Sequence, residues 1–137
     1  DIKKGSKVIE YKGKVITRKQ AEENPKYDND KAIYLFNLNK RYDLDGDFKF
    51  NTARLINHSC NPNCEVDIIK GQIWISSIKN IKKGEELNYD YGYAFDPDDF
   101  RDHVCKCGSK NCVGFIISSD EWKKYLKYIT KIIKKND

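Results

Sequence analysis

Residues 54–64 read RLINHSCNPNC, so amide, imidazole, hydroxyl and thiol groups follow one another between two hydrophobic segments. Groups of this kind are costly to bury unless each finds a partner. Asn, Ser and Pro also mark turns, however, and His58 could simply satisfy a backbone carbonyl. For this stretch alone, a polar turn and a functional site therefore stay equally open.

A second polar segment, ELNYDYGY at residues 86–93, carries three Tyr at alternate positions after the turn at Lys83-Gly84. If residues 87–91 are extended, Tyr89 and Tyr91 project to one face of the strand. Two neighbouring phenol hydroxyls can line a polar slot in an aromatic wall, which suits an amine or a cation. A cross-strand aromatic ladder is the alternative for these residues alone.

Three of the five Cys stand close together in CKCGSKNC, residues 105–112. Five Cys cannot form a complete disulfide framework, whereas four metal ligands and one buried thiol account for all of them. Thiolates at this spacing suit a tetrahedral zinc site, which predicts a zinc ion and a reducing compartment. The candidates for the fourth ligand are Cys60, Cys64, His58 and His103.

Short apolar segments separated by turn residues predict a β-rich fold with few helices and no alternation of strands and helices. Residues 7–17 predict a hairpin around Lys12-Gly13. Residues 66–78 predict another around Lys70-Gly71, with Trp74 packed inward. Residues 32–38 predict a further strand, and residues 51–58 one or two helical turns.

Two α-helices are expected. Thr17 and Gln20 form a capping box for a short helix that runs to Glu23. Over residues 118–137, apolar residues recur at helical spacing opposite a face of lysines, with Ser118 and Glu121 as a second capping box. We expect this amphipathic helix to close the core; the alternative is a membrane-surface or partner-docking helix. The apolar stripe consists of Trp122, Tyr125, Leu126, Ile129, Ile132 and Ile133.

Composition bounds the function classes. The 137 residues, 39% of them hydrophobic, fit one compact soluble domain with a core of modest size. No run approaches the roughly 20 apolar residues that a membrane helix needs. A net charge of +5 is too weak to indicate a nucleic-acid partner, and we expect none. The chain contains no Met, so we expect a fragment or a processed form.

Taken together, NHSCNPN at residues 57–63, ELNYDYG at 86–92 and C-x-C-x4-C at 105–112 resemble the SET-domain protein lysine methyltransferases with a post-SET tail. KKGSKVIEYKGKVIT and YLFNL resemble the early strands and the central strand, so the resemblance covers residues 2 to about 117. It implies a fold of small curved sheets with a pseudoknot. The expected organisation is a SET domain over residues 1–100, without the family's upstream Gly-x-Gly motif, a zinc-binding segment over 101–117 and the helix over 118–137.

The resemblance also implies an activity, the transfer of a methyl group from S-adenosylmethionine to a lysine side chain. Asn57 and His58 would bind the cofactor. Tyr34 would contact the cofactor and flank the methyl-transfer pore. Tyr91 would be the active-site tyrosine, and Tyr89 would line the substrate channel and limit the number of methyl groups.

For the metal and the substrate, the resemblance implies one structural zinc ion and an aromatic wall of the lysine channel at Phe115. Cys64 would then be the spare thiol. The zinc ligands would be Cys60, Cys105, Cys107 and Cys112.

The expected partner is a protein with a lysine-bearing tail, such as a histone, bound by a monomer that does not contact nucleic acid directly. An intracellular location follows, in the nucleus on chromatin for a eukaryotic source and otherwise in the cytoplasm or as a secreted effector. The alternative is a catalytically inactive SET-like module that only binds a lysine-bearing tail, which the absent Gly-x-Gly motif would favour. A zinc-organised nucleic-acid binder ranks last because Arg is scarce.

Overall fold

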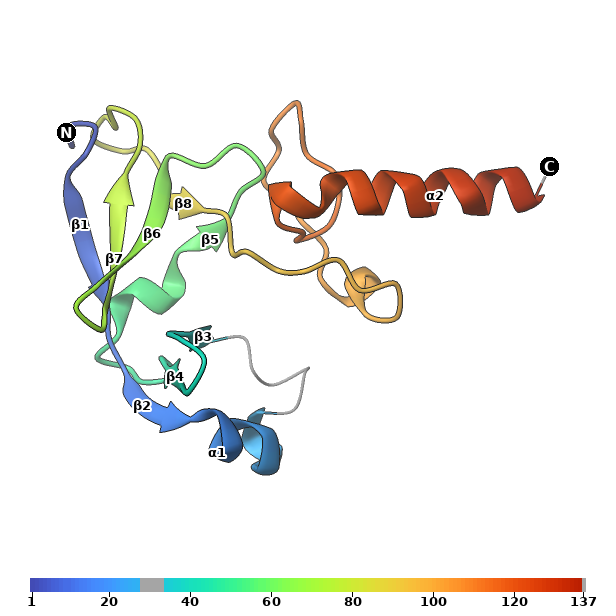
Figure 1. The fold of residues 1–137 in the computed structure, drawn as a ribbon. Helices are drawn as coiled ribbons and strands as arrows, with labels where there is room; N and C mark the ends of the chain where they lie inside the picture. The colour runs from blue at the N-terminus through green and yellow to red at the C-terminus, as the bar shows by residue number, and fades with distance from the viewer. Residues whose placement is uncertain (28–33, 137) are drawn as a thin grey trace. The chain divides into compact units, whose positions relative to one another are not determined.

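The computed structural model describes residues 1–27 and 34–136, which divide into two compact units (Figure 1). The first unit comprises Asp1–Ile56 and Val66–Lys83, and the second comprises Asn57–Glu65 and Gly84–Asp137. Each unit is thus assembled from two separate stretches of chain. The expectation of one compact unit is therefore wrong. Composition indicates how much apolar surface a chain can bury, but it does not show whether the residues pack into one unit or two.

The first sheet of the first unit contains β1 (Lys7–Tyr11), β7 (Gln72–Ser77) and the part of β6 (Cys64–Ile69) that begins at Val66. Strands β6 and β7 are joined at Lys70 and Gly71, whose φ angles of 52° and 78° suit a two-residue hairpin turn. This hairpin is confirmed. The inward packing of Trp74 is wrong: Ile73 and Ile75 are fully buried, and Trp74, which points to the other face, is half-buried with Lys7 Nζ 5.1 Å from its ring.

The predicted hairpin over residues 7–17 is also wrong. Strand β1 pairs with β7, whereas β2 (Lys14–Thr17) pairs with β4 (Tyr42–Asp45) in a second sheet of order β2-β4-β3. Gly13 does not turn the chain back; a Cβ at this position would collide with the backbone carbonyl of Asp45. The glycine therefore allows two backbones to approach closely.

The remaining elements of the first unit are short. Strand β3 (Leu35–Asn37) is shorter than the predicted 32–38, of which residues 32 and 33 lie outside the described part. Helix α1 (Arg18–Glu23) begins at the predicted capping box, because Thr17 Oγ1 accepts from the Gln20 N–H at 3.1 Å and Gln20 Oε1 accepts from the Thr17 N–H at 2.8 Å. The two 3₁₀ turns are η1 (Pro25–Tyr27) and η2 (Thr52–Leu55).

The second unit contains little regular structure before its C-terminal helix. Strands β5 (Asn57–His58) and β8 (Asn88–Tyr89) are parallel, and Cys64 at the start of β6 pairs with β8. The 3₁₀ turns η3 (Phe100–Asp102) and η4 (Ser119–Glu121) precede α2 (Trp122–Asn136). Small sheets, few short helices and a C-terminal helix confirm the predicted fold class, while the pseudoknot stays a prediction.

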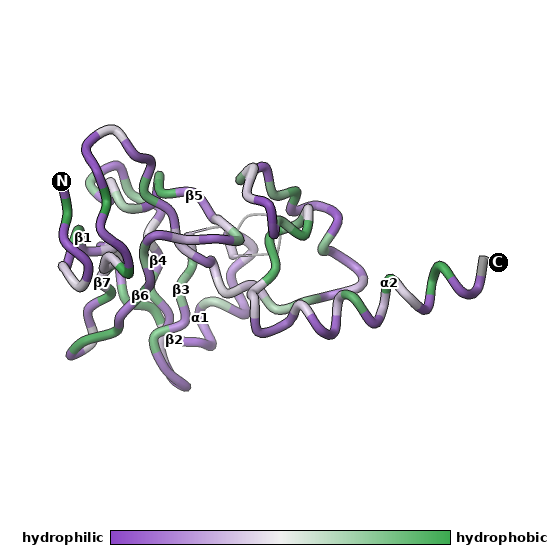
Figure 2. Tube along the Cα trace, turned by 90° about the horizontal axis from the view of Figure 1, so that it is seen from above, coloured by the Kyte–Doolittle hydropathy of each residue, from purple (hydrophilic) through white to green (hydrophobic). Residues whose placement is uncertain are grey.

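Helix α2 departs from expectation in two ways. Its predicted capping box is wrong, since the Ser118 side chain caps nothing and the Ser118 carbonyl instead accepts from the Glu121 N–H at 2.8 Å. Hydrophobic and hydrophilic residues alternate along its trace (Figure 2), yet none of its described side chains is buried. Leu126 and Ile133 are 55% and 57% exposed, so the helix does not close a core along its whole length.

Each unit contains buried apolar residues of its own. The largest buried apolar side chains of the first unit are Tyr11, Ile16, Leu44, Ile73, Ile75 and Ile81. Those of the second are Tyr89, Phe100 and Ile117, accompanied by three buried Cys. Within the described residues, no helix has the length and apolar character needed to cross a membrane.

Candidate cofactor and metal site

The parallel pair β5 and β8 brings the two polar motifs together. Asn57 lies beside Asn88 and His58 beside Tyr89 in the register of the pair. The backbone N–H of Ser59 donates to the Tyr89 carbonyl at 3.1 Å, which continues the contact one residue beyond β5. Segments that are distant in sequence therefore present their side chains at one place.

Part of this polarity is structural. The side-chain carbonyls of Asn63 and Asn88 each accept the backbone N–H of the other residue at 2.9 Å. The Asn63 amide also donates to the Glu86 carbonyl at 2.9 Å. These three hydrogen bonds connect the loop after β5 to the segment before β8. For Asn63, the interpretation as part of a polar turn is therefore confirmed.

His58 is buried, and its Nδ1 accepts the backbone N–H of Tyr91 at 3.0 Å. Burial lowers the pKa of His58, although the carboxylate of Asp90 acts in the opposite direction. The imidazole is therefore held neutral. Its ring meets the Tyr91 ring edge to face, with centroids 5.4 Å apart. The Tyr89 ring lies tilted against the Tyr91 ring, with centroids 5.0 Å apart.

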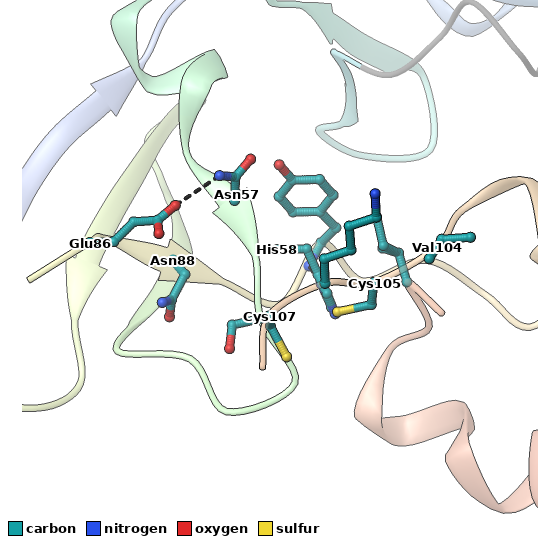
Figure 3. A pocket seen from close by; sticks show the side chains of 11 residues that line it. Asn57, His58, Glu86, Asn88, Val104, Cys105 and Cys107 are labelled. Carbon is teal, nitrogen blue, oxygen red and sulfur yellow. Dashed lines mark hydrogen bonds between the residues drawn. The ribbon is translucent and has the colours of Figure 1, made fainter. Parts of the chain in front are cut away.

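A cavity of about 310 Å³ opens beside these residues, at the lower end of the range for small-molecule sites (Figure 3). Asn57 donates to Glu86 Oε1 at 2.8 Å on one side of it, and Val104 and Cys105 lie on another. The predicted residues Asn57, His58 and Tyr91 all line it.

Sequence reasoning missed other residues that line this cavity. Glu86 and Asn88 belong to the tyrosine-rich motif, and their polarity next to a turn was the available signal. Val104 and Lys106 alternate with Cys105 and Cys107, so a short extended tail offers thiols and cavity-lining side chains in turn.

The four predicted zinc ligands come together. The sulfur atoms of Cys60, Cys105, Cys107 and Cys112 all lie within 4.8 Å of one another. The Cys60 and Cys105 sulfurs are 3.9 Å apart, close to the roughly 3.8 Å between ligands of a tetrahedral zinc site with Zn–S bonds of about 2.3 Å. Cys64 and His103 lie outside this group, so the donor set fits a metal ion that prefers thiolates.

The surroundings of the thiols shift their pKa values in different directions. Burial raises the pKa of Cys60, and it raises the pKa of Cys105 to about 11. Burial also acts to raise the pKa of Cys107, but hydrogen bonds led by that of the Ser109 hydroxyl, 3.1 Å away, prevail and lower it to about 5. A dication would stabilise all four as thiolates.

The cysteine tail folds back on itself and onto the loop that follows β5. The Cys105 N–H donates to the Gly114 carbonyl at 2.9 Å, and the Ile116 N–H donates to the His103 carbonyl at 2.7 Å. The Asn111 amide donates to the Cys60 carbonyl at 3.1 Å. A hydrogen bond therefore connects the tail to Cys60, and the tail supplies part of the cavity wall.

Three residues that the resemblance places in catalysis or the substrate channel are not among those that line the cavity. Tyr89 is 4% exposed and lies against Tyr91. Phe115 packs in an aromatic cluster, with ring centroids 5.0 Å from Phe100 and 6.2 Å from Tyr125. Tyr34 belongs to the first unit, where its carbonyl accepts from the Tyr11 hydroxyl and from the Gly46 N–H. Their roles stay predictions.

A comparison with protein families finds a match between residues 1–92 and the SET domain. The chain belongs to the SET-domain family. This family match ends at Gly92, so it includes Cys60 but not the tail that carries Cys105, Cys107 and Cys112.

Individual relatives of this SET-domain chain match more of it than the family comparison does. It is 38% identical over 118 residues to human histone-lysine N-methyltransferase 2D, and 38% identical to histone-lysine N-methyltransferase trithorax of Drosophila virilis, in each case over 82% of the chain. It is 35% identical to histone-lysine N-methyltransferase ASHR3 of Arabidopsis thaliana over 84% of the chain. The matched part spans only 2%, 3% and 24% of these relatives, respectively.

Proposed function

We propose that this chain is the catalytic domain of a protein lysine N-methyltransferase that uses S-adenosylmethionine and acts on a histone or another basic protein. The observation that carries the proposal is the hydrogen bond between His58 and the Tyr91 backbone at the edge of one cavity. It joins the NHSC and NYDY motifs of a SET domain at a single place. The names of the relatives, all histone-lysine N-methyltransferases, support the class of substrate.

In this proposal, the cavity holds the nucleoside end of the cofactor. Asn57, Glu86 and Asn88 offer amide and carboxylate groups there, and Val104 offers an apolar surface. A few placed polar groups and an apolar wall are typical of small-molecule sites. When bound, S-adenosylmethionine supplies an electrophilic methyl group on a sulfonium centre.

The chain's own task is to present a neutral lysine amine. Free Lys has a pKa of about 10.4 and is almost wholly protonated at neutral pH. A channel that excludes water disfavours the ammonium form, and the proton can leave to solvent without a strong side-chain base. Tyr91 then orients the reacting groups, Tyr89 limits the room for added methyl groups, and Tyr34 and Phe115 line the approach.

We further propose that Cys60, Cys105, Cys107 and Cys112 hold one zinc ion. The mutual approach of their sulfur atoms within 4.8 Å supports this assignment. The domain boundaries at residues 100 and 117 belong to the same proposal, as does action as a monomer that does not bind nucleic acid. The relatives' names support an intracellular site of action, in the nucleus on chromatin for a eukaryotic source.

The test is a methyl-transfer assay with the full chain. The zinc-loaded protein is incubated with methyl-labelled S-adenosylmethionine and either core histones or a basic protein without histone sequence, such as egg-white lysozyme. Mass spectrometry then locates the methyl groups. We expect methylated lysines on at least one of these proteins, with loss of the signal for Tyr91→Phe. Methylation of the histones alone would narrow the substrate class to histones.

Two outcomes would contradict the proposal. Cofactor binding without transfer to a lysine of any of these proteins would favour the inactive module that only binds a lysine-bearing tail. Methylation of a side chain other than lysine would place the chain in another class of methyltransferase.

A further inference from the structure

The imidazole of His58 has both of its ring nitrogens next to a polar atom of another residue. Nδ1 accepts the backbone N–H of Tyr91 at 3.0 Å. Nε2 lies 3.9 Å from the sulfur of Cys60. The side chain is only 2% exposed, so water does not compete for either nitrogen.

The first contact decides the direction of the second. A nitrogen that accepts an amide N–H carries no proton, so the neutral ring must carry its proton on Nε2. Nε2 is therefore a donor, and it faces sulfur, which accepts most strongly as a thiolate.

The nearby carboxylate does not compete for Nδ1. Asp90 Oδ1 is 3.9 Å from Nδ1 but accepts from the Gly92 N–H at 2.9 Å. Asp90 Oδ2 accepts from the Ser119 N–H at 3.0 Å. Both carboxylate oxygens accept from backbone amides, and 3.9 Å is too long for a hydrogen bond to Nδ1, so the Tyr91 N–H at 3.0 Å is the partner of this nitrogen.

We propose that His58 is a positioning residue whose imidazole links the cysteine centre to the turn that carries Tyr91, through Nε2–H to the Cys60 sulfur and through Nδ1 from the Tyr91 backbone. The inference rests on the proposed zinc site and on the proposed role of Tyr91. It revises the role of His58 in cofactor binding: with both nitrogens committed and the side chain 2% exposed, the imidazole forms no hydrogen bond to the cofactor.

The link has a physical purpose at each end. Four thiolates around one dication carry an excess of negative charge, and an N–H donor to one sulfur offsets part of it. Mutation of a group that hydrogen-bonds to a metal ligand typically lowers metal affinity by about 10- to 100-fold. At the other end, the same ring holds the backbone of Tyr91 in place and so fixes the position from which the Tyr91 side chain extends.

Two substitutions separate the two ends. The amide of His58→Asn stands where Nδ1 stood, so it can accept from Tyr91 but cannot reach Cys60. The amide of His58→Gln stands where Nε2 stood, so it can donate to Cys60 but leaves the Tyr91 N–H without its acceptor. His103→Asn is the matched control, because His103 lies outside the cysteine group.

Zinc affinity, measured on the full chain by competition with a chromogenic chelator, reports the Cys60 end. Hydrogen exchange of the Tyr91 amide, measured by NMR, reports the other end. We expect His58→Asn to weaken zinc binding about 10- to 100-fold with a protected Tyr91 amide. We expect His58→Gln to keep its zinc and lose the protection, and His103→Asn to change neither.

A measurement on the unaltered protein tests the link even if the variants do not fold. The ¹⁵N shifts of the His58 ring should report the Nε2–H tautomer, and an Nδ1–H tautomer or an imidazolium would overturn the link. Equal losses in both His58 variants would assign His58 to packing alone, and unchanged zinc affinity in His58→Asn would refute the contact with Cys60. A chain that binds no zinc would instead refute the proposed metal site itself.

Discussion

Tyr91 and Tyr89 are neighbours on one face of the same segment, but they meet different surroundings. Tyr91 lines the cavity, whereas Tyr89 is 4% exposed and packs against the Tyr91 ring. Because Tyr91 borders the cavity and Tyr89 is buried, substitutions of the two residues should have different effects.

Replacing Tyr91 by Phe should lower turnover by about 10²–10³-fold, because only the hydroxyl that orients the reacting groups is lost. Cofactor affinity and thermal stability should change little, since the ring and its contact with His58 remain. Single-turnover kinetics on the histone lysine that the enzyme methylates measure turnover, and a cofactor titration measures cofactor affinity. Unchanged turnover would show that another group fills this role.

Replacing Tyr89 by Phe should shift the products towards higher methylation. A phenol that limits the space around the amine is removed without changing the ring, so the first transfer should stay largely intact. Time courses resolved by mass spectrometry, at matched first-step rates, check this. Identical product distributions for the variant and the unaltered protein would assign Tyr89 to packing, as its burial also permits.

At the scale of elements, α2 shows that an amphipathic pattern does not specify how much of a stripe is covered. Tyr125 and Tyr128 pack against Phe95 and Phe100, with ring centroids between 5.4 and 6.0 Å apart. Leu126, on the same stripe, is 55% exposed. The helix is therefore held to its unit by aromatic rings near its start.

Tyr125→Ala should consequently destabilise the second unit by about 2 kcal/mol, from lost apolar burial and lost ring pairs. Leu126→Ala should change the free energy of unfolding by less than about 0.5 kcal/mol, as expected for an exposed position. Lys127→Ala is a surface control. Urea unfolding is followed in a Trp74→Phe background, in which Trp122 fluorescence reports the second unit alone. Equal losses of unfolding free energy for the Tyr125 and Leu126 variants would mean that the whole apolar stripe is covered.

At the scale of the whole molecule, the cysteine group closes the tail of residues 105–112 onto Cys60, and both segments border the cavity. Metal analysis should give one zinc per chain. Cys107→Ser should lose the metal and the activity together, because one of the four ligands is gone and the cavity wall at Val104 and Lys106 loosens.

Cys64→Ala is the matched control for that experiment. Cys64 is buried, as Cys60 and Cys105 are, but it lies outside the group of four, so its variant should keep the zinc. A metal-free preparation with full activity would contradict the structural role of zinc. Loss of zinc from the Cys64 variant would point to a different set of ligands.

Local chemistry in the sequence determined several features directly. The capping box at Thr17 and Gln20 and the turn at Lys70-Gly71 depend on residues that are adjacent in the chain, and both were predicted correctly. The three cysteines of residues 105–112 likewise indicated a metal site, because their spacing alone lets them converge.

Tertiary structure decided what depends on distant partners. The residues alone could not choose the fourth thiol, and only the fold brings the Cys60 sulfur within 3.9 Å of that of Cys105. Nor could they show that Gly13 faces the Asp45 carbonyl instead of turning a hairpin. Strand pairing and side-chain convergence depend on which segments meet in space, and one-dimensional periodicity carries no information about that meeting.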